Sequence, residues 1–215
     1  MRKVLILLTT TVVAGSALAQ TPPTEQQVAN AKYMGTRTCR PCHMSAAQGR
    51  QYAVWDSSLH AAAYRTLGTD QAKTIGSRLG VTNPQTDARC LKCHVTAATL
   101  PAARRAPRFD QTEGVGCEAC HGPGEFYKAK STMCQITTGQ LQPACVGLVV
   151  PTEQVCVTCH NQQSPTYKPF NFQTFSRKIA HPIPAARKQQ DRQQGCGAGA
   201  SGAGGASGTG ASGAQ

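Results

Sequence analysis

Residues 117–121 read Cys117-Glu118-Ala119-Cys120-His121, two cysteines three positions apart followed directly by a histidine. The same pattern occurs at three other places, which are Cys39, Cys42 and His43; Cys90, Cys93 and His94; and Cys156, Cys159 and His160. Cys-x-x-Cys-His is typical of c-type haem attachment. The two cysteines form thioethers to one edge of a haem, and the adjacent histidine becomes the proximal ligand of its iron. The sequence therefore predicts four covalently bound c-type haems (haem c, with iron).

Two other interpretations of a Cys-x-x-Cys pair compete with haem attachment. Two such pairs can bind zinc, and one pair can act as a redox dithiol. A single motif would leave both alternatives open. Because all four copies in this chain are followed by histidine, the haem interpretation is strongly favoured over both.

The first 19 residues have the pattern of a secretory signal peptide. Arg2 and Lys3 precede an apolar run from Val4 to Gly15, and small residues at Ala17 and Ala19 allow cleavage after Ala19. The apolar run is about 12 residues long, well short of the roughly 20 that a spanning helix needs. Residue 20 is Gln and not Cys, so no lipid anchor is indicated. We expect a periplasmic or extracellular protein whose mature chain does not span the membrane.

The chain is basic, with a net charge of +12 that falls to +10 when Arg2 and Lys3 are removed. The basic residues are scattered and only 5% of residues are aromatic, so we expect no nucleic-acid partner. Haem propionates would offset much of the excess charge, because buried carboxylates need cationic partners. The low aromatic content predicts a thin protein core that haem faces complete, and hence an apo-protein that is largely unfolded.

The predicted fold class is mainly α with extensive loops and little or no sheet, organised as a multihaem cytochrome c fold around four haems. Apolar spacing predicts a helix over 45–67, with Ser45 as the cap. A second helix is expected over 70–79, ended by Gly80 and the Asn83-Pro84 turn, and a Thr-Glu-Gln pattern predicts a short helix within 152–160 that carries the last cysteine pair. Prolines and glycines predict loop over 97–116 and no long regular structure over 165–184. The expected organisation is a signal peptide at 1–19, an N-terminal lead-in at 20–34, a tetrahaem domain at 35–185 and a flexible Gly/Ala/Ser-rich tail at 186–215.

Several segments resemble the tetrahaem cytochrome c family typified by the electron acceptor of hydroxylamine oxidoreductase, the cytochrome c-554-like multihaem cytochromes. The likeness covers roughly 35–183 and includes Gly35 and Trp55-Asp56-Ser57-Ser58-Leu59-His60-Ala61. Its most specific part is Gly114-Val115-Gly116-Cys117-Glu118-Ala119-Cys120-His121-Gly122-Pro123-Gly124. The resemblance implies haems packed in near-contact pairs, most of them with a second, distal histidine.

The resemblance also implies iron-ligand roles for the two histidines outside the motifs. His60 matches the Trp-x-x-x-x-His segment of the family, and His181 lies where the family has a late distal histidine. Ser131 stands where the family has a histidine about ten residues after the third motif, so the haem that this histidine would serve loses its expected partner. With six histidines in the chain, at most two irons can have two histidine ligands. The other two irons are then five-coordinate, bound by water, bound by a methionine or lysine near Ser131 (Met133, Lys128 or Lys130), or completed by a partner protein.

Three cysteines lie outside the motifs: Cys134, Cys145 and Cys196. An exported location favours a disulfide between Cys134 and Cys145. Cys196, at the edge of the tail, can be a free thiol or an intermolecular link.

The leading functional hypothesis is an electron-transfer protein that exchanges electrons with redox partner proteins, without catalytic residues of its own. All six histidines are assigned to iron, and of the carboxylates only Glu118 and Glu125 lie close to a motif, where we expect them in solvent. One alternative is a reductase of a small nitrogen or sulfur oxide at an open haem. Another is a haem subunit docked on a larger membrane-bound electron-transfer complex.

Overall fold

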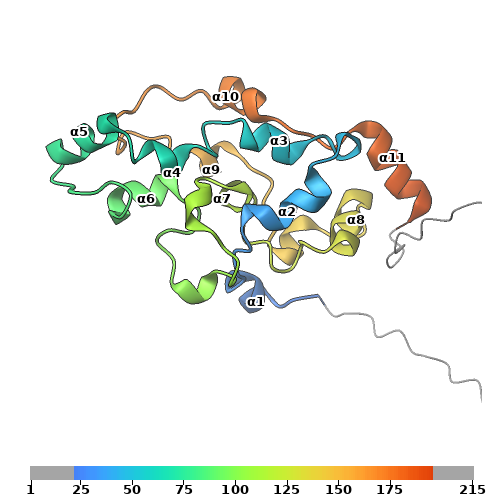
Figure 1. Cartoon of the computed structure of the whole chain (residues 1–215). Coiled ribbons are helices and arrows are strands. Elements are labelled where there is room, and N and C mark those ends of the chain that lie inside the picture. The colour runs from blue at the N-terminus through green and yellow to red at the C-terminus, as the bar shows by residue number, and fades with distance from the viewer. Residues whose placement is uncertain (1–21, 196–215) are drawn as a thin grey trace, which may run out of the picture.

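The structure is a computed structural model that describes residues 22–195, in which short helices are joined by turns and loops (Figure 1). The α-helices are α1 Glu25–Ala29, α2 Thr36–His43, α3 Gln51–Asp56, α4 Ala63–Thr66, α5 Asp70–Arg78, α6 Ala88–His94, α7 Cys117–His121, α8 Lys130–Thr138, α9 Glu153–Val157, α10 Phe172–Ile179 and α11 Ala185–Gln194. Four 3-10 turns, η1 to η4, lie at Ala46–Gln48, Ala102–Arg104, Gln111–Glu113 and Pro143–Val146. Within residues 22–195 the only β pairing is an isolated bridge between Tyr33 and Arg105. The predicted mainly helical fold with little or no sheet is confirmed.

The helices form an elongated body, with α5 and α11 at opposite ends and α7 near the middle (Figure 1). Helix α2 packs against α3 and α7, α4 packs against α6, and α8 packs against α11. The first three Cys-x-x-Cys-His motifs lie on α2, α6 and α7, and the fourth begins on α9 and continues past its end. Helices α2, α7 and α9 lie toward the middle of the body, and α6 lies toward the end that α5 occupies (Figure 1).

The predicted continuous helix over 45–67 is wrong, because the chain turns sharply at residues 49 and 50. Gly49 has φ of +100° and Arg50 has φ of 54°, and a Cβ at Gly49 would lie 2.5 Å from the Pro182 carbonyl oxygen. The segment consequently divides into η1, α3 and α4. Ser45 does act as a cap, but of η1, where its hydroxyl accepts a hydrogen bond from the Gln48 amide.

The other helix predictions have mixed outcomes. The helix over 70–79 is confirmed as α5, capped by the Thr69 hydroxyl. Helix α9 occupies only part of 152–160, and α10 gives regular structure to the region 165–184. Residues 186–194, which the sequence assigns to a flexible tail, belong to α11, where Arg187 pairs with Asp191 at 2.8 Å. The expected lead-in contains α1, closed by a capping box between Thr24 and Gln27.

The apolar core of the described chain is small. Its buried hydrophobic residues are mostly small or medium in size, and they are Ala31, Ala61, Leu67, Val81, Val95, Ala106, Tyr127 and Val146. No large side chain among residues 22–195 is fully buried. Protein interiors are normally close-packed with side chains, so the polypeptide alone does not fill the centre of this fold.

The disulfide predicted between Cys134 and Cys145 is wrong. Cys134 is disulfide-bonded, whereas Cys145 is an exposed free thiol. Cys196, the predicted signal peptide at 1–19 and the part of the predicted tail from 196 onward lie outside the described residues. Among the described helices, none has the length and apolar character needed to cross a bilayer.

Candidate haem-binding site

Each motif is built on a short helix that ends at or just before its histidine. Helix α7 consists of the third motif alone, Cys117–His121, and α2 and α6 end at His43 and His94. In the fourth motif α9 ends at Val157, and the chain continues as a turn through His160. Residues at i, i+3 and i+4 lie on one side of a helix. The two cysteines and the histidine of each helical motif therefore share one face, as attachment of a single haem requires.

Three of the proximal histidines are oriented through their Nδ1 atoms. His94 Nδ1 lies 2.8 Å from the Ala63 carbonyl oxygen, and His121 Nδ1 lies 3.1 Å from that of Val149. His43 Nδ1 lies 3.3 Å from Gln51 Oε1. A metal-binding histidine usually donates its second ring N–H to a carbonyl or amide oxygen of this kind, which leaves Nε2 for the metal.

Two pairs of histidine rings face each other. The ring centroids of His60 and His160 are 6.0 Å apart, with an interplanar angle of 79°. Those of His121 and His181 are also 6.0 Å apart, with an angle of 69°. A metal–imidazole bond is about 2.0–2.1 Å long, so two rings on opposite sides of one iron have centroids roughly 6 Å apart. Both pairs thus have the spacing of two axial ligands.

One histidine in each facing pair has a lowered pKa, which favours the neutral imidazole, the form that binds iron. Burial lowers the pKa of His60, and the nearby His160 lowers it further. Burial is also the main reason that the pKa of His121 is lowered, with His181 and His43 adding to the effect. His181 is oriented through Nδ1, which lies 2.7 Å from the Ile179 carbonyl oxygen.

The structure thus brings both predicted distal histidines next to proximal histidines of the motifs. His60 faces the fourth motif and His181 faces the third, so the serine at 131 does not leave His121 without a facing ring. Among residues 22–195, His43 and His94 have no histidine ring paired with them in this way.

The motifs themselves lie close together in pairs. A hydrogen bond with Cys117 is the main reason that the pKa of the Cys39 thiol is raised, and the same bond lowers the pKa of Cys117. Burial and then Cys159 raise the pKa of Cys93 to about 11. Burial and then Cys156 raise the pKa of Cys120 to about 11. The first motif therefore adjoins the third, the second adjoins the fourth, and the third also adjoins the fourth.

Glu118, expected in solvent, is buried at the centre of this arrangement with only 3% of its surface exposed. Its carboxylate accepts hydrogen bonds from the amides of Met34 (2.7 Å), Gly35 (2.8 Å) and Gly124 (2.6 Å). Burial raises its pKa, and these backbone bonds offset part of that effect. Glu118 thereby ties the chain just before the first motif to the third. This role of Glu118 could not be predicted from the sequence, because its partners are backbone amides.

Glu113 has a similar function at the start of α2. Its Oε2 accepts a hydrogen bond from the Thr36 amide at 2.7 Å, and Oε1 lies 3.5 Å from Arg37 Nε. A carboxylate is favourable at a helix N-terminus, where backbone N–H groups lack partners. Together with Glu118 it fixes the helix of the first motif against the segment that leads into the third.

The segment Trp55–Ala61 packs onto the glycines before the third motif. Trp55 Nε1 donates to the Val115 carbonyl oxygen at 2.8 Å, and the Val115 amide donates to the His60 carbonyl oxygen at 3.0 Å. Gly114 has φ of +78°, and a Cβ there would lie 2.7 Å from the His60 carbonyl oxygen. These contacts hold His60 in the position from which it faces His160.

Aromatic rings extend from the fourth motif to the surface. Phe170 stacks on the His160 ring with centroids 4.8 Å apart, and Phe175 stacks on Phe170 at 5.4 Å. Phe175 is 42% exposed, and Lys178 Nζ lies 4.8 Å from its ring centroid. This stack was not predicted, because Phe170 and Phe175 show no motif in the sequence.

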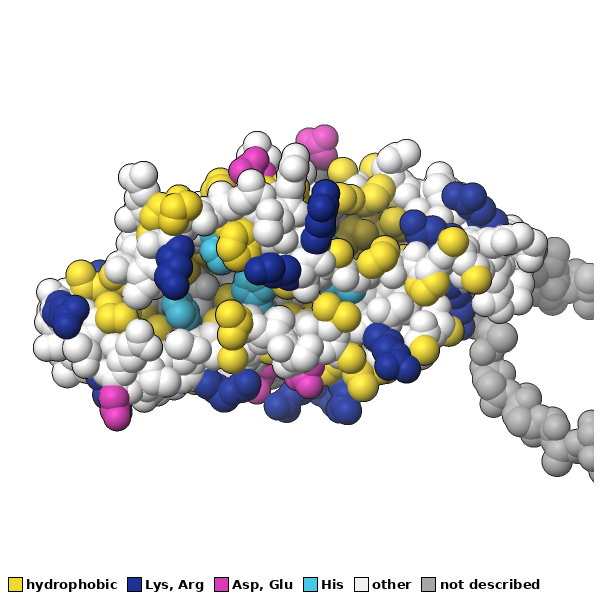
Figure 2. Space-filling view, turned by 90° about the horizontal axis from the view of Figure 1, so that it is seen from above, with side chains coloured by type: hydrophobic (Ala, Val, Ile, Leu, Met, Phe, Trp, Pro, Cys, Tyr) yellow, Lys and Arg dark blue, Asp and Glu magenta, His cyan; other side chains and the backbone are white. Residues whose placement is uncertain are grey.

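The residues present fit covalently bound haem. Figure 2 shows histidine side chains inside an elongated hollow, flanked by hydrophobic side chains and by Lys and Arg. The eight motif cysteines are free thiols, none of them buried. Among residues 22–195, no group of three or more His, Cys, Asp or Glu is arranged to hold a metal ion by itself. The donor set is therefore suited to flat apolar groups attached by thioethers and ligated by imidazoles, and such groups would also complete the thin core.

Comparison with known proteins agrees with this geometry. The sequence model of the family "Cytochrome c554 and c-prime" matches residues 38–122, a range that contains the first three motifs. Cytochrome c-554 of Nitrosomonas europaea is 30% identical over 144 residues, which cover 61% of this chain and 59% of that protein. The chain thus matches less than two thirds of the length of this relative. No solved structure matches the chain. Over these residues the chain is similar to the cytochrome c-554-like proteins, and this similarity supports a c-type cytochrome with covalently bound haem c.

Proposed function

We propose that this protein is a periplasmic or extracellular tetrahaem c-type cytochrome that transfers electrons between redox partner proteins. The observation that carries the proposal is the two pairs of facing histidine rings, His60 with His160 and His121 with His181, each with centroids 6.0 Å apart. Iron with two histidine ligands has no open position for a substrate, so these two sites suit electron exchange and not substrate binding.

In this proposal two cysteines and one histidine of each motif would hold a haem, and the haem would supply one-electron redox chemistry. The protein sets the affinity for the electron through the axial ligands, their hydrogen bonds and the burial of the site. The carbonyl oxygens of Ala63 and Val149, placed against His94 and His121, increase the basicity of these rings. They thereby favour the oxidised iron over the reduced iron.

The close approach of the motifs supports transfer inside the molecule. Cys39 adjoins Cys117, and Cys93 adjoins Cys159, so residues that hold different haems are neighbours. Electron exchange between neighbouring haems needs no acid or base from the protein. This agrees with the assignment of all six histidines to the haem sites, which leaves no histidine for acid–base catalysis.

One specific observation favours a second candidate. His43 and His94 face no second histidine among the described residues, so the irons that they would bind can keep an open position. An open iron is what a reductase of a small nitrogen or sulfur oxide requires. This activity would be confined to the first and second motifs.

The test combines haem counting with turnover assays on the mature holoprotein. We expect intact-mass analysis to give four haem increments on a chain that begins at Gln20. We expect the reduced protein to be reoxidised rapidly by redox proteins, but to show negligible turnover of nitrite, hydroxylamine, nitric oxide or tetrathionate. Sustained turnover at or above about 1 s⁻¹, the low end of ordinary enzyme rates, would show that the protein is a reductase and not only an electron carrier. Fewer than four haems would contradict the tetrahaem proposal.

A further inference from the structure

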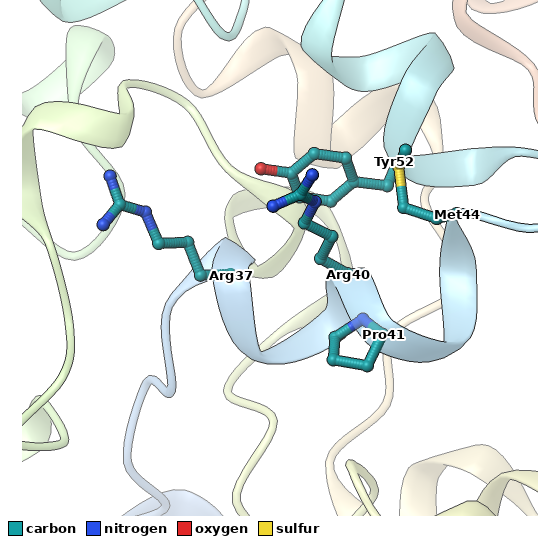
Figure 3. Close-up of a pocket in the computed structure, with 5 residues that line it drawn as sticks. All are labelled: Arg37, Arg40, Pro41, Met44 and Tyr52. Atoms are coloured by element: carbon teal, nitrogen blue, oxygen red, sulfur yellow. The ribbon is translucent and has the colours of Figure 1, made fainter.

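Helix α2 has two chemically different sides. Cys39, Cys42 and His43 of the first motif recur at i, i+3 and i+4 and so share one side of the helix. The opposite side carries two arginines, a proline and a methionine, which are Arg37, Arg40, Pro41 and Met44. With Tyr52 from α3 these four line a surface cavity of about 400 Å³ (Figure 3). The cavity thus lies across the helix from the side that would hold the first haem.

The cavity presents a guanidinium with unused donors. Arg40 lies over the Tyr52 ring, 5.6 Å from its centroid (Figure 3), a contact worth about 0.5–1 kcal/mol at an exposed site. Among residues 22–195, no carboxylate forms an ion pair with Arg40. The aromatic ring orients the planar group without occupying its N–H donors, which match a carboxylate in geometry.

Arg37 also lines the cavity, but its guanidinium points away from Arg40 and Tyr52 (Figure 3) and lies 3.6 and 3.5 Å from Asp110 and Glu113. Arg40 is therefore the arginine of this lining that forms no ion pair with residues 22–195. The apolar part of the lining is accessible, since Met44 is 41% exposed. Arginine, tyrosine and methionine are the residue types enriched in protein interfaces, and arginine and tyrosine are frequent among the residues that carry most of the binding energy.

We propose that this cavity, the Arg40 cavity, is the docking site for a carboxylate-bearing surface of a redox partner protein. Arg40 carries a positive charge that no carboxylate among residues 22–195 neutralises, which favours an acidic partner by charge complementarity. Docking on the outer side of α2 brings the partner within one helix diameter, about 10–12 Å, of the side that would hold the first haem. The inference rests on the proposed electron-transfer function and names the class of its partner.

The probe is a fluorescein-labelled hexaglutamate peptide, and the measurement is fluorescence anisotropy with the holoprotein at low ionic strength. We expect Arg40→Gln to raise the Kd about tenfold, since interface arginines that carry binding energy have effects of this size. Tyr52→Leu, which removes the platform under Arg40, should raise the Kd by a smaller factor. The matched control is Arg78→Gln, which removes one exposed arginine at the end of α5 and should change the Kd less than twofold.

Equal losses of affinity in Arg40→Gln and Arg78→Gln would overturn the proposal, because the peptide would then respond only to net charge. Failure of the wild-type protein to bind the peptide would overturn it as well. Haem content is measured in each variant, and Arg40 is exposed, so folding should be unchanged. Dithionite reduction and air reoxidation, followed in the same samples, test the electron-carrier function separately: haems that do not cycle would defeat that function whatever the peptide does.

Discussion

The third and fourth motifs differ from the first and second in what stands opposite their histidines. His121 and His160 each face another histidine ring at 6.0 Å, whereas His43 and His94 are oriented through Nδ1 but face no such ring in the described chain. All four have the same local pattern on or beside a short helix. The difference teaches that the attachment motif would supply only one axial ligand of each haem, and that tertiary packing decides whether a second histidine lies opposite it.

The third motif also has the larger structural role. It adjoins the first motif through Cys117 and the fourth through Cys120, and its Glu118 binds the amides of Met34 and Gly35. The second motif lies on α6, which packs against α4. Loss of the haem from the third motif should consequently disturb the whole molecule, whereas loss from the second should be local.

The largest expected effect follows from removing these attachments one at a time. The double variant Cys117→Ser/Cys120→Ser should lose on the order of 5 kcal/mol or more of the free energy of unfolding, comparable to the whole stability of a small domain, and should fail to accumulate. Cys90→Ser/Cys93→Ser should instead yield a folded protein with three haems. Intact mass and far-ultraviolet circular dichroism measure both outcomes. Equal behaviour of the two variants would show that the third motif is not central.

The second prediction concerns the facing histidines. The oxidised wild-type protein should show low-spin signals of bis-histidine iron from two haems in electron paramagnetic resonance. His181→Ala should lose the signal of the third motif and keep that of the fourth, because His181 faces His121 and not His160. Met133→Ala is the control and should leave both signals unchanged. Four bis-histidine signals from the monomer, or loss of both in His181→Ala, would contradict the pairing.

The sequence was sufficient for the parts of the site that are local. The motifs locate the cysteines and histidines that the structure brings together, and the helix expected over 70–79 is confirmed as α5. The partner of His121 could not be predicted, because His181 comes from a distant segment with little local pattern. The break at Gly49 was missed for a similar reason: the atom that a Cβ would meet belongs to Pro182.

The burial of Glu118 and the presence of α11 could not be predicted from the sequence either. Glu118 lies inside a motif, where its side chain could equally have faced solvent, and its burial depends on the amides of Met34, Gly35 and Gly124. Such partners carry no side-chain signal in a sequence. Helix α11 was missed because its residues are polar, whereas its packing against α8 and the pair of Arg187 with Asp191 are tertiary features.

A third prediction tests the contact between the helices of the first and third motifs. A Cβ at Gly116 would lie 2.1 Å from Thr36 Oγ1, and its next neighbours are at 3.4 and 3.5 Å. Gly116→Ala should therefore cost about 1–3 kcal/mol of the free energy of unfolding, the usual range for overpacking. Adding Thr36→Ala removes the clashing oxygen and should restore most of the loss. Denaturant unfolding measures both, and a double variant no more stable than Gly116→Ala alone would show that this contact does not join the two motifs.

The smallest expected effect separates the two facing pairs from each other. Trp55→Phe retains an aromatic ring but removes the donor to the Val115 carbonyl oxygen, a bond of 2.8 Å. It should lower the free energy of unfolding by about 1 kcal/mol, the usual net value of one hydrogen bond. Because Trp55 lies in the segment that holds His60, the low-spin signal of the fourth motif should broaden, whereas that of the third, with His181, should not. Tyr64→Phe on α4 is the matched control, since the Tyr64 hydroxyl forms no hydrogen bond with the described residues, and it should change neither stability nor signal. Broadening of both signals in Trp55→Phe would contradict this prediction. It would mean that a change near His60 also disturbs the pair of His121 and His181, and that the two pairs differ only in which histidines form them.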